Sequence, residues 1–149
     1  MHNLFDKQTT DTMLARIGAL QPNSAASWGK MNASQMLAHC CEGLETALGH
    51  KQLKRTLLGY IFGSWAKKQM LGNKPFDKNL PTDKSFIKKG QHDFITEKEK
   101  LTALIQEFHL KGETAFIDKV HPFFGKMNAY EWSVLQGKHL DHHLRQFGV

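Results

Sequence analysis

Three histidines stand close together near the C-terminal end of this 149-residue chain. His139 and His143 are four positions apart, a spacing that places two side chains on successive turns of one helix face. Zinc-type ions accept imidazole nitrogens at about 2.0–2.1 Å, so this pair could supply two ligands to one ion. His142 forms a three-residue pair with His139, and spacing alone leaves the choice between the pairs open. The alternative is a polar network in the core, or a helix end with three solvated histidines.

A third ligand has to come from another helix, and His39 is the best-placed candidate. It lies at the edge of an apolar helical stripe, one turn before Gly43, where the absent side chain leaves space. A single histidine in such a place is more often structural than a ligand. Counted from the expected helix starts, His39 is seven positions in and His139 is eleven, so their levels differ by about 6 Å unless the helices are staggered. Weaker candidates are His50, His92, His109 and His121.

Polar neighbours of these histidines are candidates for supporting a metal site. His142 and Gln146 fall on the same core-facing stripe as His139 and His143. Glu42 lies one turn from His39 on its outer flank, where a glutamate could act as an acid or base but is more often simply solvated. The sequence assigns no catalytic residue.

The two cysteines, Cys40 and Cys41, are adjacent. They cannot form the spaced disulfide framework of a small secreted domain, so reduced thiols in a cytoplasm are expected. Cys40 falls on the apolar stripe and Cys41 on the far side of the same helix, so neither clearly shares the direction of His39. Both are predicted to be chemically inert.

Four stretches with helical periodicity position these residues. Apolar side chains recur at three- and four-residue steps over about 6–20, 32–50, 93–110 and 128–146. Two stretches begin with a capping-box pattern, Asn32 with Gln35 and Asn128 with Glu131. Long alternating strand patterns are missing, so we predict an all-α fold in a single domain over residues 1–149.

The segment 51–89 is too long for an ordinary connection between helices, whose median length is about 4–6 residues. Residues 56–71 have helical periodicity, and residues 72–84, with Pro75 and Pro81, are expected to be irregular. We expect this segment to fold over one end of the helices as a lid. The apolar residues expected to pack inward are Leu57, Leu58, Ile61, Phe62 and Trp65.

Positive charge is concentrated in the same segment. Residues 51–89 contain ten basic and two acidic residues, a balance of +8, whereas the whole chain carries +6. These lysines are most simply a solvated face, or they line the entrance to a site for an anionic substrate. The alternative function is a non-catalytic binding module in which this segment engages an anionic partner, either a nucleic acid or a membrane surface.

Several function classes lack support in the sequence. No apolar run reaches about 18 residues, so no membrane span is expected, and the N-terminus has no charged-then-apolar signal pattern. No phosphate-binding glycine loop, Gly-x-Ser-x-Gly elbow or zinc-finger spacing occurs. We expect a cytoplasmic protein without a specific nucleic-acid partner, and the oligomeric state, including a homodimer, stays open.

One short motif occurs twice in the chain. GKMNA stands at 29–33 and again at 125–129, which indicates either two similar helix entries or two equivalent halves of a pseudo-symmetric bundle.

Two stretches of the chain, 28–40 and 121–148, carry a family resemblance. The C-terminal run HPFFGKMN at 121–128 and the histidine-rich KHLDHHLRQFG at 138–148 resemble the DinB/YfiT-like superfamily, and more narrowly an uncharacterised family within it. The segments WGKM at 28–31 and QMLAHC at 35–40 resemble the same family.

The resemblance implies a four-helix bundle with a long, partly helical insertion between its second and third helices. It also implies a metal site built from one histidine of the second helix and an H-x-x-x-H pair of the fourth, which are His39, His139 and His143 here, with His142 as a neighbour that is not a usual ligand. Three histidines with open positions around one divalent ion, nickel, zinc or iron, are typical of a catalytic site. The implied activity is a thiol-dependent transferase or a metal-assisted hydrolase acting on a small molecule, such as an anionic thiol.

Overall fold

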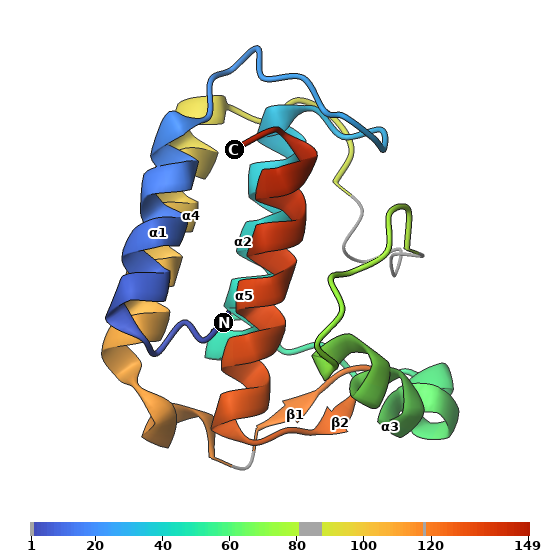
Figure 1. The fold of residues 1–149 in the computed structure, drawn as a ribbon. Coiled ribbons are helices and arrows are strands. Elements are labelled where there is room, and N and C mark those ends of the chain that lie inside the picture. Colours follow the sequence, from blue (N-terminus) through green and yellow to red (C-terminus); the bar gives the residue numbers. More distant parts are fainter. Residues whose placement is uncertain (1, 81–87, 118) are drawn as a thin grey trace.

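The computed structural model describes residues 2–80, 88–117 and 119–149, and they are mostly helical (Figure 1). The helices are α1 (Lys7–Ala19), α2 (Ala33–Leu48), α3 (Leu57–Leu71), α4 (Phe94–Lys111) and α5 (Ala129–Gln146), with a short 3-10 helix η2 (Glu113–Phe116). Two strands, β1 (Val120–His121) and β2 (Gly125–Lys126), pair antiparallel. The predicted helices are all present. The all-α expectation misses the strands, because two residues each are too few to produce an alternating pattern.

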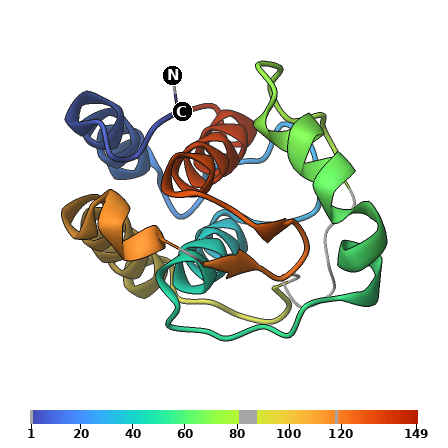
Figure 2. The same cartoon turned by 90° about the horizontal axis from the view of Figure 1, so that it is seen from below.

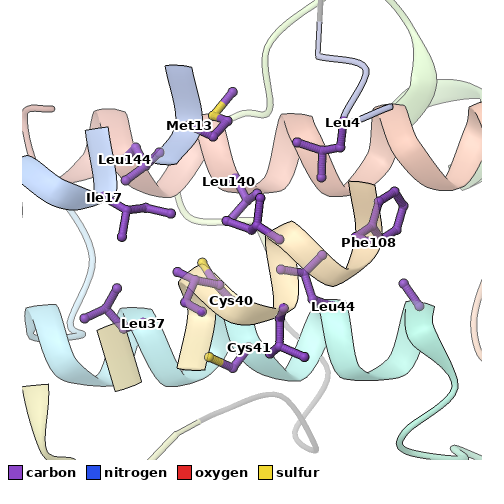
Figure 3. Close-up of a cluster of buried hydrophobic side chains, with 14 of the residues drawn as sticks. Leu4, Met13, Ile17, Leu37, Cys40, Cys41, Leu44, Phe108, Leu140 and Leu144 are labelled. Carbon is purple, nitrogen blue, oxygen red and sulfur yellow. The ribbon is translucent and has the colours of Figure 1, made fainter. Parts of the chain in front are cut away.

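The helices α1, α2, α4 and α5 lie side by side around one apolar core (Figure 1). Helices α1 and α5 run in one direction, and α2 and α4 run in the opposite one. Figure 3 shows core side chains from all four helices, among them Ile17, Leu37, Leu44, Phe108 and Leu144, each at most 1% exposed. The antiparallel course of α2 and α5 brings the start of α2 to the end of α5, where the Ser27 amide donates to the Gln146 carbonyl at 2.8 Å.

The repeated GKMNA motif folds into the same helix entry twice. At both sites the motif's asparagine caps the helix in a complete capping box, Asn32 with Gln35 in α2 and Asn128 with Glu131 in α5. The glycine three residues earlier has a positive φ in both copies, +82° and +78°, a conformation that an L side chain rarely adopts. The motif therefore encodes a left-handed residue followed by a capping box.

Helix α3 stands apart from this core and packs against α5 and β2 (Figures 1 and 2). Gly59 and Gly63 face the backbone at Phe123, where a Cβ on Gly59 would lie 2.6 Å from the carbonyl oxygen. The larger apolar side chains therefore point to solvent, with Leu57 78% and Trp65 67% exposed. The prediction of an inward-packing lid helix was wrong, because only the glycine face can approach the hairpin this closely. Residues 81–87 of the expected lid, including Pro81, lie outside the described residues.

No helix in the described parts of the chain is both long enough and apolar enough to cross a bilayer. The longest helices, α4 and α5, have 18 residues each and carry several charged side chains.

Candidate metal centre

Three histidines from two helices converge on one point. One nitrogen from each of His39, His139 and His143 lies within 4.8 Å of the other two, so the cluster could hold a metal ion. The three ring centroids are each 4.8 Å from one another, with the rings turned edge to face. The Nε2 atoms of His39 and His139 face each other at 2.8 Å. His39 and His143 are buried and His139 is partly buried, so the cluster lies largely within the protein.

The antiparallel packing of α2 and α5 explains why the residues meet. His39 lies seven residues after the Asn32 cap of α2, and His139 lies seven residues before Gln146, the last residue of α5. The expected difference of about 6 Å in height along the helix axes arises only when both positions are counted from the helix starts. Because the helices run in opposite directions, the start of α2 and the end of α5 are at the same level (Figure 1).

Gln146 orients the His143 ring, in agreement with its predicted place beside the histidines. Its Oε1 accepts a hydrogen bond from His143 Nδ1 at 2.8 Å, and its Nε2 donates to the Trp28 carbonyl at 2.5 Å. A proton on Nδ1 leaves the lone pair of His143 on Nε2, the atom available to a metal. The glutamine itself is only 3% exposed, so its two hydrogen bonds fix the side chain firmly.

The sequence suggests that Gly43 leaves space beside His39, and the structure places the ring of His139 at this glycine. A Cβ at Gly43 would lie 3.3 Å from His139 Nδ1 and 3.1 Å from Gln136 Oε1. Gln136 is buried, and its Oε1 has no hydrogen-bond partner among the described residues. Sequence reasoning missed Gln136, although its position one turn before His139 on the same helix is a signal that could have found it.

Burial keeps His139 and His143 uncharged. It lowers the pKa of His143 to about 3 and that of His139 well below the ordinary range, and mutual repulsion among neighbouring histidines adds to both shifts. Neutral imidazole is the form that binds metals, so the environment favours ligand behaviour.

His142 and Glu42 do not join this cluster. The His142 ring contacts that of His143 at 5.0 Å, but no His142 nitrogen is among those that converge, and the ring also lies 5.7 Å from that of Trp28 and 5.9 Å from that of Phe76. The Glu42 carboxylate is neither solvated nor directed at His39, because it forms ion pairs with Lys51 at 2.5 Å and with Lys88 at 2.6 Å.

The two lysines determine the charge state of Glu42. Burial raises the pKa of this carboxyl, but hydrogen bonds and attraction to Lys51 and Lys88 outweigh burial and leave the pKa below its ordinary value. Glu42 is therefore a charged carboxylate within a lysine cluster.

Both cysteines are buried, each 1% exposed. Cys41 was expected on the far side of α2, but α4 covers that side, and its Sγ lies 3.7 Å from the Glu97 carbonyl. Burial raises the pKa of Cys40 and raises that of Cys41 to about 12, which favours the protonated, unreactive thiols.

The weaker histidine candidates have separate partners. His50 and His92 pair with Glu107 and Glu97, and His109 contacts the Leu4 carbonyl. The fourth, His121, accepts hydrogen bonds from the backbone amides of Phe123 and Phe124.

A small cavity of about 40 Å³ lies beside the cluster and does not include it. Helix α5 contributes Lys138, Asp141, His142 and Arg145 to its wall. His142 links the two places, because it lines the cavity and its ring lies 5.0 Å from that of His143.

Comparison with known proteins identifies a family. No curated protein and no solved structure matches the chain. The profile of the family described as "Protein of unknown function (DUF1569)" matches residues 3–148, nearly the whole length. The chain therefore belongs to the DUF1569 family.

Proposed function

We propose that this protein is a metal-dependent enzyme whose single divalent ion is held by His39, His139 and His143. One observation carries the proposal: three imidazoles from two helices converge with their ligand nitrogens within 4.8 Å of one another. A largely buried group of three histidines without a metal would have to satisfy its nitrogens through hydrogen bonds alone.

The donor set suits nickel, zinc or iron, because imidazole is a good ligand for each of them. Three protein ligands leave positions open for water or substrate, as catalytic sites do and structural sites do not. A bound ion of this kind supplies Lewis acidity and lowers the pKa of a water or a thiol.

The surrounding residues prepare the ligands. Gln146 holds the proton of His143 on Nδ1, and Gly43 leaves room for the His139 ring. The apolar side chains of α2 and α5 exclude bulk water from the inner side of the cluster.

We further propose that the family is part of the DinB/YfiT-like superfamily. Helices α1, α2, α4 and α5 would be its four-helix bundle, residues 51–89 the insertion, and the whole chain a single cytoplasmic domain. The histidines support this assignment, since His39 is on the second of these helices and His139 and His143 are on the fourth. The activity implied is a thiol-dependent transferase or metal-assisted hydrolase acting on a small anionic thiol or a similar substrate.

Elemental analysis tests the proposal directly. Protein purified without added metal and without an affinity tag should contain about one divalent ion per chain. His143→Ala should abolish binding, whereas His142→Ala should leave it largely intact, because His142 lies outside the cluster. Stoichiometric metal in the His143 variant, or none in the parent after reconstitution, would end the proposal.

A further inference from the structure

Helix α3 carries an apolar surface that the other described residues leave largely exposed. Six large apolar side chains are between 53% and 78% exposed, namely Leu57, Leu58, Tyr60, Ile61, Phe62 and Trp65. Single exposed apolar residues are ordinary, but six on one helix of 15 residues form a continuous patch. This apolar face of α3 is defined by these six residues.

The orientation of α3 is set by its glycines. Gly59 and Gly63 are buried against the backbone at Phe123, and Cβ atoms at either position would collide with it. Lys138 adds a second restraint, because its ammonium donates to the carbonyls of Met70 and Gly72, each at 2.6 Å, at the C-terminal end of the helix. The helix cannot roll its apolar face inward without breaking these contacts.

Positive charge is concentrated in the part of the sequence that contains the apolar face. Residues 51–80 contain seven basic residues and one acidic residue, Asp77. Some of this charge is neutralised, since Lys51 pairs with Glu42 and Lys67 with Glu131. Three exposed lysines have no ion-pair partner among the described residues: Lys54, Lys68 and Lys74.

We infer that the apolar face of α3 docks on an anionic lipid surface. Exposed leucine, isoleucine and aromatic side chains bordered by lysines are typical of helices that lie in the plane of a membrane interface. Tryptophan and tyrosine favour that interface because their rings are apolar with one polar group. The lysines supply attraction to anionic headgroups.

Charge and chemistry favour lipid over the other occupants. A second copy of the chain would bring two basic surfaces together, which is unfavourable. A nucleic acid would attract the lysines, but Leu57 and Ile61 have no apolar partner on a phosphate backbone. An anionic membrane satisfies both the lysines and the aliphatic side chains.

The position of α3 permits such docking without disturbing the core. Seen from below, α3 lies at the edge of the molecule. The hairpin and α5 separate it from α1 and α4 (Figure 2). The inference is independent of metal binding, since none of the three clustered histidines lies on α3.

Vesicle flotation with the full chain tests the inference. The protein should float with vesicles of phosphatidylcholine and phosphatidylglycerol in equal parts, and much less with vesicles of phosphatidylcholine alone. The double variant Ile61→Ser, Trp65→Ser should lose at least about tenfold in affinity. The matched control, Ile95→Ser with Leu110→Ser, removes exposed apolar residues from α4 and should bind as the parent does. Circular dichroism should give the same helix content for all three proteins.

Two further variants separate the contributions of charge and insertion. Lys54→Gln with Lys68→Gln should weaken binding to the anionic vesicles and reduce its dependence on salt. Trp65→Phe should retain binding but lose the blue shift of tryptophan fluorescence on addition of vesicles, since Trp65 is the tryptophan on the docking face.

Four outcomes overturn the inference. Absence of flotation with anionic vesicles is one, and equal flotation with uncharged vesicles is another. Concentration-dependent dimerisation that Ile61→Ser with Trp65→Ser abolishes would assign the face to a second copy. Binding of duplex DNA at physiological salt that the same variant abolishes would assign it to nucleic acid.

Discussion

Helices α5 and α3 pack against each other, but they differ in which kinds of side chain they bury and which they expose. Helix α5 buries polar residues, with His143, Gln146 and Lys138 between 3% and 7% exposed. Helix α3 exposes apolar ones, with Leu57 and Trp65 at 78% and 67%. The difference follows from their neighbours, because α5 is packed against several helices whereas, among the described elements, α3 packs mainly against α5 and the hairpin.

The comparison shows where to look for function in a protein of this kind. A buried histidine without a partner and an exposed apolar patch are both unfavourable unless something satisfies them. In α5 the available partners are a glutamine, two other imidazoles and the metal ion that we propose. In α3 no part of the chain that the structure describes covers the apolar face, so a partner outside the chain is the natural one.

The largest expected effect concerns the two cysteines of α2, Cys40 and Cys41. It tests whether their buried positions keep thiol reagents out. Native protein should react with a thiol-alkylating reagent at pH 8 far more slowly than unfolded protein. A rise in the Cys41 pKa from 9.0 to about 12 alone reduces the reactive thiolate roughly 1000-fold. Mass spectrometry of timed samples measures the rate. Alkylation of either cysteine at the unfolded rate would show that this side of α2 is open.

A smaller effect is expected where polar residues support one another in α5. Gln146→Leu removes the acceptor of the His143 hydrogen bond and should weaken metal binding by about 10- to 100-fold. Calorimetric titration of the apoprotein with zinc measures the change. The control is Gln106→Leu, which replaces an exposed glutamine of α4 and should bind zinc as the parent does. Unchanged affinity in the Gln146 variant would remove its supporting role.

The packing of α3 is tested by adding one methyl group. Gly63→Ala places a Cβ against the Phe123 carbonyl oxygen and should lower the free energy of unfolding by about 1–3 kcal/mol. Gly18→Ala is the matched control in α1, where nothing lies within 4 Å of the new Cβ, and it should stabilise by about 0.5–1 kcal/mol. Denaturant titration distinguishes them. If both substitutions stabilise, the glycine face of α3 is not held against the hairpin.

The smallest effect concerns the charged side of α2. Glu42→Gln should cost about 1 kcal/mol near neutral pH, because its lysine partners are partly exposed and can be rehydrated. The pKa of Glu42 is lowered on folding, so its contribution is present above the ordinary value of 4.5 and is lost as the pH falls through the folded value. The difference between parent and variant in unfolding free energy should therefore shrink as the pH falls below 4.5. A difference that grows on acidification would contradict this sign.

Much of the local structure could be predicted from the sequence. The capping boxes at Asn32 and Asn128 mark helix starts because a cap hydrogen bond involves residues three positions apart. The pairing of His139 with His143 is local in the same sense, since one helix turn separates them. Gly43 likewise indicates open space on α2, although the sequence does not show that the ring of His139 fills it.

Long-range packing decided the rest. His39 meets His139 and His143 because α2 and α5 are antiparallel, and residue counting from the helix starts carries no information about direction. Glu42 and Cys41 are buried because lysines and α4 cover them, which periodicity on α2 alone cannot indicate.

The clearest case is α3, where periodicity identified the apolar stripe but not the side that faces the protein. A stripe predicts burial only if a neighbouring element is there to cover it. Here the hairpin admits only the glycines Gly59 and Gly63, so close backbone contact, rather than apolar area, set the orientation of the helix. The sequence by itself determined the helices and the chemistry that they carry, and the tertiary structure decided which faces meet, because that depends on contacts between residues far apart in the chain.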